Sequence, residues 1–168
     1  MEGEIVNKVQ QSGLIQLSMA DFIPSGKRVE IDLKDQLWQG IALKEKEFRT
    51  WIKENDWSIY EGYFVAVHCS EDAIIPSWAY MLVSSKLTGV AKEVYCGSIK
   101  EMNKFLIRNT IDHLDLEPYK DQRVIIKGCG EPVHEDAWMA FVSKFQTVCK
   151  SIMFGEPCST VPVYKRPK

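Results

Sequence analysis

Three cysteines stand where short apolar runs of the sequence give way to segments with helical patterning. Cys69 lies in "VHCSED", Cys96 in "VYCGS" and Cys129 in "KGCGEP". The amino end of a helix is electropositive and lowers the pKa of a nearby thiol, so thiolates form more easily there than on a plain surface. Thiolates that converge on one point could hold a soft or borderline cation such as zinc or iron.

A fourth cysteine, Cys158, follows the last predicted helix in "GEPCSTVPVYK". Gly155 and the nearby prolines let this segment turn back over the sheet. The sequence therefore predicts a metal site whose three thiolates leave one coordination position open for a carboxylate, water or a partner's ligand. The predicted ligands are Cys69, Cys129 and Cys158, with Asp72 or Glu156 nearby.

Several of these residues also have a purely structural interpretation. Cysteine is among the most buried residue types, and at a strand end it is commonly a small core residue. Cys149 lies on an apolar helical stripe and is predicted to be core, and Cys96 follows a weak strand and is predicted to be structural. Asp72 precedes a helix, where capping is the more common role of an aspartate.

The three histidines are weaker candidates for the same site. His68 is adjacent to Cys69, and neighbours on a strand point to opposite faces, so we expect His68 to be satisfied by backbone groups. His134 precedes two acids at a helix start, where capping is the ordinary role, although its distance of five residues from Cys129 permits a contact with that thiol. His113 fits the favourable position near a helix carboxyl end.

Hydrophobic periodicity predicts the elements that must position these residues. Residues 63–67 and 123–128 are apolar at odd and even positions alike, which is typical of strands buried on both faces. Residues 28–33 instead alternate apolar and polar side chains, as a strand with one solvent-exposed face does. Ser98 and Glu101 have the spacing of a capping box at a helix start. A helix is predicted at residues 44–56, where Phe48, Trp51 and Ile52 share one stripe. A second begins at Pro76 with Trp78, Met81 and Leu82 on one side, and a third at Ser98 with Met102, Phe105, Leu106 and Ile111 buried. A fourth begins at Glu135, and its apolar stripe recurs as far as Ile152.

The alternation of strands and helices predicts an α/β fold. Its expected form is a three-layer, mainly parallel sheet with a βαβαβα core, preceded by antiparallel strands near the N-terminus. Parallel strands end at one edge of a sheet, and sites in open α/β sheets gather at that edge. The three cysteine-bearing corners are therefore expected to lie side by side.

Composition restricts the class of protein and of partner. The chain has 168 residues, which favours a single domain over residues 1–168, with residues 155–168 as an extended tail that packs back on the domain or on a partner. The formal net charge of −2 disfavours nucleic acid and membrane surfaces as partners, and leaves a protein partner or a homo-oligomer. No leader or membrane span is recognisable, and five cysteines form an odd set without a CxxC pair, so we expect a cytoplasmic protein with reduced thiols.

Four segments spread over much of the chain form a recognisable pattern: "VEIDLKDQLWQGIALKEKEFR", "HCSEDAIIPSWAYM", "IKGCGEP" and "SIMFGEPCSTVPVYK". Through these segments the chain resembles a bacterial family of unknown function, domain of unknown function 2480 (DUF2480). The resemblance brings no activity with it, and implies a link with iron–sulfur cluster assembly because genes of that family tend to lie near genes for that process. His68 and His134 fall outside the family pattern, whose matching positions are Cys69, Asp72, Pro76, Trp78, Cys129, Glu156 and Cys158.

Three functions remain open from the sequence. The favoured hypothesis is a cysteine-lined site that binds a metal, zinc or iron, or handles iron–sulfur clusters. The second is a thiol enzyme with Cys129 or Cys69 as nucleophile, activated by a helix end and in one version by His134. The third is a non-catalytic interaction module in which the cysteines only pack. The usual signatures of nucleotide, phosphate, zinc-finger and serine-hydrolase sites are absent from the sequence.

Overall fold

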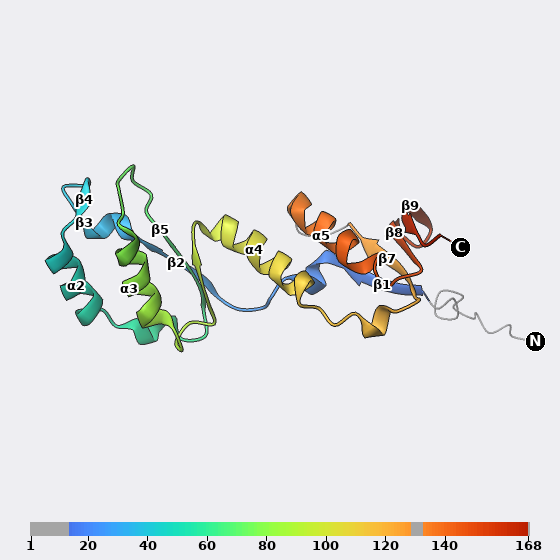
Figure 1. Cartoon of the computed structure of the whole chain (residues 1–168), viewed down its shortest axis with the longest axis horizontal. Coiled ribbons are helices and arrows are strands. Elements are labelled where there is room, and N and C mark those ends of the chain that lie inside the picture. The colour runs from blue at the N-terminus through green and yellow to red at the C-terminus, as the bar shows by residue number, and fades with distance from the viewer. Residues whose placement is uncertain (1–13, 129–132, 168) are drawn as a thin grey trace, which may run out of the picture. The chain divides into compact units, whose positions relative to one another are not determined.

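The computed structural model of the protein describes residues 14–128 and 133–167 (Figure 1). The chain divides into two compact units, which we call unit 1 (Met1–Pro24 and Lys104–Lys168) and unit 2 (Ser25–Asn103). The chain thus leaves unit 1 after Pro24 and returns to it within helix α4 (Ile99–Asp112). A single domain over residues 1–168 stays a prediction, because it concerns whether the two units unfold together.

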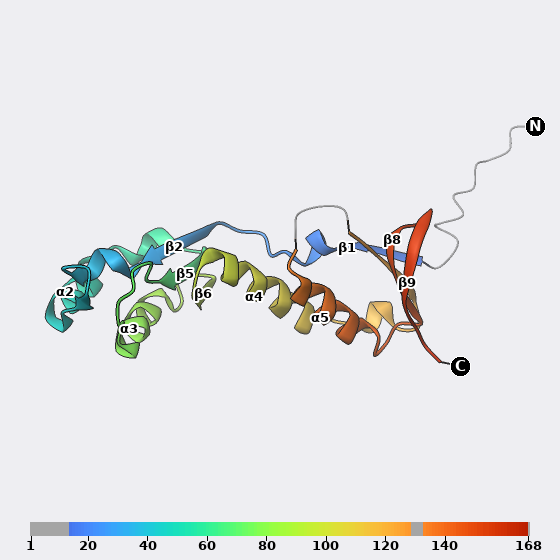
Figure 2. The same cartoon turned by 90° about the horizontal axis from the view of Figure 1, so that it is seen from above.

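Unit 2 is built on three parallel strands in the order β2–β5–β6. The helix α3 lies over one face of these strands (Figure 2). A short antiparallel pair, β3 and β4, follows β2. The elements of unit 2 in chain order are β2 (Arg28–Asp32), β3 (Leu37–Trp38), β4 (Ala42–Leu43), α2 (Glu45–Glu54), β5 (Phe64–His68), α3 (Ser77–Leu87) and β6 (Glu93–Cys96).

The core of unit 2 lies between this sheet and the helices α2 and α3. Val65 and Val67 alternate toward the helices, where they pack in one buried cluster with Phe48 and Ile52 of α2. Phe48 and Ile52 are one helical turn apart, so the predicted apolar stripe of this helix is confirmed. The opposite face of the sheet takes the alternate residues, among them Glu30, Asp32 and His68.

The buried face of α3 differs from the prediction. The fully buried residues are Ala79, Val83 and Leu87, which repeat every four positions, whereas Met81 is 70% exposed. Two small residues, Ala79 and Val83, let the helix backbone approach the sheet closely. The larger residues expected to be buried together are therefore divided, and Met81 faces outward.

Unit 1 is built on a sheet of four strands in the order β1–β7–β8–β9. The first three run parallel, and β9 pairs antiparallel with β8. Gly128 follows β7 at a close approach, since a Cβ added there would lie 2.4 Å from the ring of Phe154. The elements are β1 (Leu14–Ser18), the second half of α4, β7 (Arg123–Lys127), α5 (Glu135–Phe145), β8 (Ser151–Glu156) and β9 (Ser159–Lys165).

The core of unit 1 gathers on α5. The rings of Phe141 and Phe145 stack with centroids 4.0 Å apart, and Cys149 is fully buried beside them, so its predicted core role is confirmed. The helix ends at Phe145, and Ile152 belongs to β8. The apolar spacing continued past the helix because the strand that follows faces the same core.

The mixed α/β class with mainly parallel sheets is confirmed, and antiparallel pairing near the N-terminus is found in β3 and β4. The capping box of α4 is also confirmed, since Ser98 Oγ and the Glu101 backbone N–H lie 3.3 Å apart and the Ser98 N–H donates to the Glu101 carboxylate at 2.9 Å. The expectation that β5, β6 and β7 share one sheet is wrong. Strand β7 pairs with β1 and β8 in unit 1. The local sequence pattern of a strand does not determine which other strands it pairs with.

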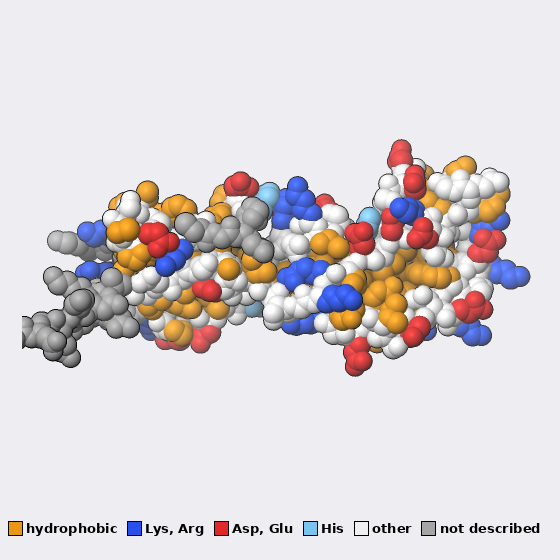
Figure 3. All heavy atoms as spheres, turned by 180° about the vertical axis from the view of Figure 1, so that it is seen from behind, with side chains coloured by type: hydrophobic (Ala, Val, Ile, Leu, Met, Phe, Trp, Pro, Cys, Tyr) orange, Lys and Arg blue, Asp and Glu red, His pale blue; other side chains and the backbone are white. Residues whose placement is uncertain are grey.

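On the face drawn in Figure 3, side chains of both charge signs are mixed with hydrophobic ones. Among the helices of residues 14–128 and 133–167, none combines the length and the apolar character needed to cross a bilayer.

Candidate functional site

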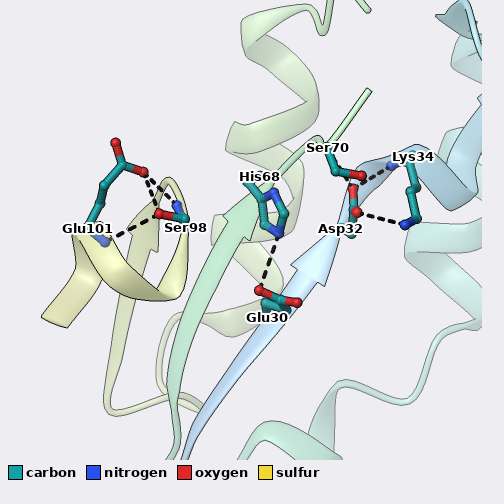
Figure 4. A network of polar contacts seen from close by, with 7 residues as sticks. All are labelled: Glu30, Asp32, Lys34, His68, Ser70, Ser98 and Glu101. Carbon is teal, nitrogen blue, oxygen red and sulfur yellow. Dashed lines mark hydrogen bonds and ion pairs between the residues drawn. The ribbon is translucent and has the colours of Figure 1, made fainter. Parts of the chain in front are cut away.

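The carboxyl ends of three parallel strands meet at one edge of the unit 2 sheet. The last residues of β2, β5 and β6 are Asp32, His68 and Cys96. Polar side chains gather at the first two of these ends (Figure 4). Because ligands of open α/β sheets bind at such edges, this is the candidate site of the molecule.

Asp32 fastens two loops together at this edge. Its Oδ1 accepts hydrogen bonds from the backbone N–H groups of Lys34 and Ser70, both at 3.0 Å, and its Oδ2 lies 3.4 Å from Lys34 Nζ. Burial acts to raise the pKa of Asp32, but the hydrogen bonds from Ser70 and Lys34 outweigh it and hold the pKa well below its ordinary value. Asp32 therefore stays ionised and ties the end of β2 to the start of the loop after β5.

His68 lies beside Asp32 in the register of β2 and β5. Its Nε2 is 3.5 Å from Glu30 Oε2, which is too long for a strong hydrogen bond. The two side chains form an ion pair only when the imidazole is protonated. This buried Nε2 has no hydrogen-bond partner in the described part of the chain. The predicted backbone partner is therefore not found for this nitrogen, and Glu30 takes the neighbouring position instead.

A pocket of about 510 Å³ lies between α3 and strand β6. Its lining is largely apolar. Hydroxyl and thiol groups interrupt it, because serine, threonine, tyrosine and cysteine side chains take part. The pocket is lined by Tyr80, Met81, Ser84 and Ser85 of α3, by Thr88 just after that helix, by Val67 of β5, and by Val94, Tyr95 and Cys96 of β6.

Two of the cysteines affect the pKa of the Tyr80 phenol. Burial raises the pKa of Tyr80, and charge on Cys96 and then on Cys69 raises it further. Cys69 is half-buried, while Cys96, predicted to be structural, has an exposed thiol at the pocket. Two thiols from neighbouring strand ends thus share one neighbourhood, although Cys96 was not among the predicted ligands.

The predicted metal ligands are distributed over both units. Cys69 and the exposed Asp72 belong to unit 2, and Glu156 and the exposed Cys158 belong to unit 1. Cys129 lies outside the described residues. Glu156 pairs with Lys127 at 3.3 Å. Asp72 does not cap α3, because Pro76 occupies the N-cap position and no side chain caps that end. A role of Asp72 in capping the loop before the helix stays a prediction.

The premise that a single sheet carries the metal site is wrong, since β5 and β7 belong to different sheets. Over residues 14–128 and 133–167, no three histidine, cysteine, aspartate or glutamate side chains form a group that could hold a metal ion. The ligand set of Cys69, Cys129, Cys158, Asp72 and Glu156 stays a prediction, because one member falls outside that range.

The other two histidines each contact a backbone group of their own helix. His134 is the N-cap of α5, where its Nδ1 accepts a hydrogen bond from the backbone N–H of Asp136 at 3.3 Å, so the capping prediction is confirmed. His113 Nδ1 lies 2.9 Å from the carbonyl oxygen of Asn109, at the end of α4. The contact considered between His134 and Cys129 lies outside the described residues.

Sequence reasoning missed Asp32 and the pocket. A signal for Asp32 was present, because an aspartate at the end of an alternating strand commonly caps the turn that follows. The pocket had no comparable signal. Tyr80 and Cys96 are 16 residues apart and meet only because α3 crosses over to bring β6 beside β5.

Comparison with known proteins gives one match. A family model described as "Protein of unknown function (DUF2480)" matches residues 3–166. No curated protein and no solved structure matches the chain.

Proposed function

Since the chain belongs to the DUF2480 family, which brings no activity with it, we propose its function from the geometry of unit 2. The protein is a non-catalytic binding module that takes an extended peptide of a partner protein beside strand β6. The observation that supports this proposal is the position of the pocket, which runs along β6, the last strand in the order β2–β5–β6.

The backbone of β6 supplies one half of the recognition. A strand at the edge of a sheet presents peptide N–H and C=O groups on its outer side, and another extended chain can pair with them. Peptide-binding domains use this mode, in which the backbone hydrogen bonds give affinity and the side-chain pockets give specificity. Here β5 pairs with one side of β6, and within residues 14–128 and 133–167 no strand pairs with its other side.

The pocket supplies the other half. Side chains of an added strand alternate in direction, so every second residue of the peptide would point toward α3. The wall that they meet is largely apolar, and includes Met81, whose flexible side chain adapts to different shapes. We therefore expect peptides with apolar residues at alternate positions.

This proposal keeps a cysteine-lined site but changes its composition. Cys96 lines the pocket, and charge on Cys69 acts on Tyr80, another residue of the lining. Metal binding, iron–sulfur cluster handling and a thiol enzyme based on Cys129 or Cys69 are not part of the proposal. Elemental analysis of anaerobically purified protein tests the metal hypothesis separately. Near-stoichiometric zinc or iron that disappears in a Cys69→Ala, Cys129→Ala variant would restore it.

The proposal is tested by selecting binders from a library of random decapeptides displayed on phage. We expect enriched peptides to alternate apolar and polar residues, and to lose at least tenfold in affinity for a Ser84→Trp variant, whose indole fills the pocket. A Thr50→Trp variant is the matched control, because Thr50 is an exposed helical residue of α2 away from the pocket. Binding that is equal in both variants, or a library without enrichment, would overturn the proposal.

Backbone pairing is tested by modifying the peptide, so that the protein itself is unchanged. Strand pairing with one neighbour uses alternate peptide N–H groups. N-methylation of a selected peptide at one parity should weaken binding at least tenfold, and at the other parity should change it little. Equal effects at both parities would show that the peptide does not bind as a strand.

A further inference from the structure

A short hairpin in unit 2 presents two large apolar side chains on a constrained turn. Strands β3 and β4 pair antiparallel, and the Ile41 N–H donates to the Trp38 carbonyl at 3.1 Å. Gln39 and Gly40 between them both have positive φ, 53° and 70°. A glutamine rarely takes this conformation, which indicates that the turn is held in place by its surroundings.

A second segment brings a third apolar side chain to the same place. An isolated parallel bridge joins Ala42 to Ile74 in the loop before α3. Trp38, Ile41 and Ile74, which we call the tip cluster, are 44%, 64% and 87% exposed. Trp38 pairs with Ala42, which also forms the bridge to Ile74, so the backbone brings the three residues to one hairpin and its neighbouring loop. A single exposed apolar residue is ordinary on a protein surface, whereas several brought together favour an interaction site.

Hydrogen bonds to Asp32 restrain the two segments that lead to the tip cluster. Asp32 accepts hydrogen bonds from the segment that leads into the hairpin, at Lys34, and from the loop that leads to Ile74, at Ser70. The ammonium of Lys44 lies 4.4 Å from the ring centre of Trp38, which orients the indole. Side chains that are already ordered lose less conformational freedom when a partner binds.

The exposed charges that stand near the tip cluster in sequence and lie outside its ion pairs are negative. Lys34 is paired with Asp32 and Lys44 with Glu47, at 3.4 Å and 3.3 Å. Asp35, Glu71 and Asp72 are exposed, stand within three residues of the tip cluster in sequence, and enter no ion pair among the described residues. A complementary surface would therefore be apolar at its centre and basic at its rim.

We propose that the tip cluster docks a partner protein through an apolar surface rimmed by lysine and arginine. Three side chains make a small contact, so the complex is transient and its affinity depends on ionic strength. The inference does not depend on peptide binding at β6, because it is based on different residues. Each site can therefore be lost without the other.

The test uses two synthetic amphipathic helical peptides that share a leucine stripe, one flanked by lysines and its twin by glutamates. Fluorescence anisotropy should show that the full chain binds the lysine peptide and not the glutamate peptide. An Ile41→Ser, Ile74→Ser variant should bind at least tenfold more weakly. An Asp35→Asn, Glu71→Gln, Asp72→Asn variant should bind more weakly at low salt and lose most of the salt dependence.

Ile59→Ser is the matched control, because Ile59 is also an exposed isoleucine, at 56%, in the segment that leads into the amino end of β5. It should leave binding unchanged. Equal binding of the two peptides, or an equal loss in Ile59→Ser and the tip variant, would overturn the proposal. Binding of the chain to phosphatidylglycerol vesicles, or self-association in sedimentation, that the tip variant abolishes would also overturn it, in favour of a lipid surface or a second copy.

Discussion

The two units share one arrangement of three parallel strands but finish its edge differently. In unit 1, β1 pairs with β7 and α5 leads from β7 to β8; in unit 2, β2 pairs with β5 and α3 leads from β5 to β6. Unit 1 then adds β9 antiparallel to β8. In the described part of unit 2, β6 is the last strand, and the pocket lies along it.

This difference shows what a strand added at such an edge does. β9 pairs with β8 along its length, from Ser159 opposite Glu156 to Lys165 opposite Ser151. Pro162 within β9 has no N–H to donate and discourages a further strand, as prolines on edge strands do. β6 contains no proline. The peptide that we propose for unit 2 would thus stand where β9 stands in unit 1.

Removal of β9 is expected to have the largest effect on this comparison. Deleting residues 159–168 removes the pairing with β8 and the contacts of Arg166 with Asp121 and with the carbonyl of Val148. We expect unit 1 to lose at least about 4 kcal/mol of stability, because a whole strand and part of its core are lost. Hydrogen exchange of the β7 and β8 amides measures this loss of stability. Unchanged protection of these amides would contradict the role given to β9.

Truncation of one core phenylalanine in each unit should cost about 3–5 kcal/mol. Phe141→Ala affects the core of unit 1 and Phe48→Ala that of unit 2, and the two residues belong to separate hydrophobic clusters. We therefore expect each substitution to reduce hydrogen-exchange protection mainly in its own unit. A uniform loss over residues 14–167 would instead support the predicted single domain and weaken the comparison of two units.

The thiols of the two units should differ by about a hundredfold in alkylation rate. Burial raises the pKa of Cys149 to about 11, against the opposing effect of the Arg166 charge, so little thiolate forms there at neutral pH. Cys96 is exposed at the pocket. Mass spectrometry after iodoacetamide treatment should find Cys96 modified first and Cys149 last, with the gap closing as the pH rises toward 11.

The labelling experiment also tests where the peptide binds. A selected peptide should slow the labelling of Cys96 and leave that of Cys158, an exposed thiol of unit 1, unchanged. Rapid labelling of Cys149 at neutral pH would contradict the core packing of unit 1. Equal protection of Cys96 and Cys158 would contradict the location of the peptide site.

Features that depend on neighbouring residues were predictable from the sequence. The stripe of Phe48 and Ile52 and the capping box of Ser98 and Glu101 need only a few positions of one helix, and both are confirmed. The end of α5 was not predictable in this way. A helix and the strand after it both present apolar residues to one core, so spacing alone placed Ile152 in the helix.

The candidate site needed information that no local pattern contains. Residues 14–18 pair with residues 123–127, and residues 28–32 with residues 64–68, and these pairings decide which strand ends meet. The sequence correctly placed thiols at strand ends but assumed one sheet, and so grouped Cys69 with Cys129. The position of Cys96 at an open edge follows only from the pairing of β6 with β5.

The smallest expected effect concerns the ends of the two N-terminal strands, where Asp32 of β2 and Ser18 of β1 each cap a short 3₁₀ turn. Asp32→Ala should cost about 1–2 kcal/mol, because two backbone N–H groups lose their acceptor, and Ser18→Ala about 1 kcal/mol. Asp35→Ala is the control for a nearby exposed carboxylate, with a change within about 0.5 kcal/mol expected.

The pH dependence separates the two caps. The pKa of Asp32 is lower in the folded protein than its ordinary value, so its stabilisation is full above that value, about 3.9, and is lost as the pH falls below it. The difference between wild type and Asp32→Ala in urea unfolding should therefore shrink below about pH 4. The serine hydroxyl does not titrate there, so the Ser18→Ala difference should stay constant from pH 7 to pH 3. A constant Asp32→Ala difference over the same range would mean that the fastening of the two loops does not depend on the charge of the carboxylate.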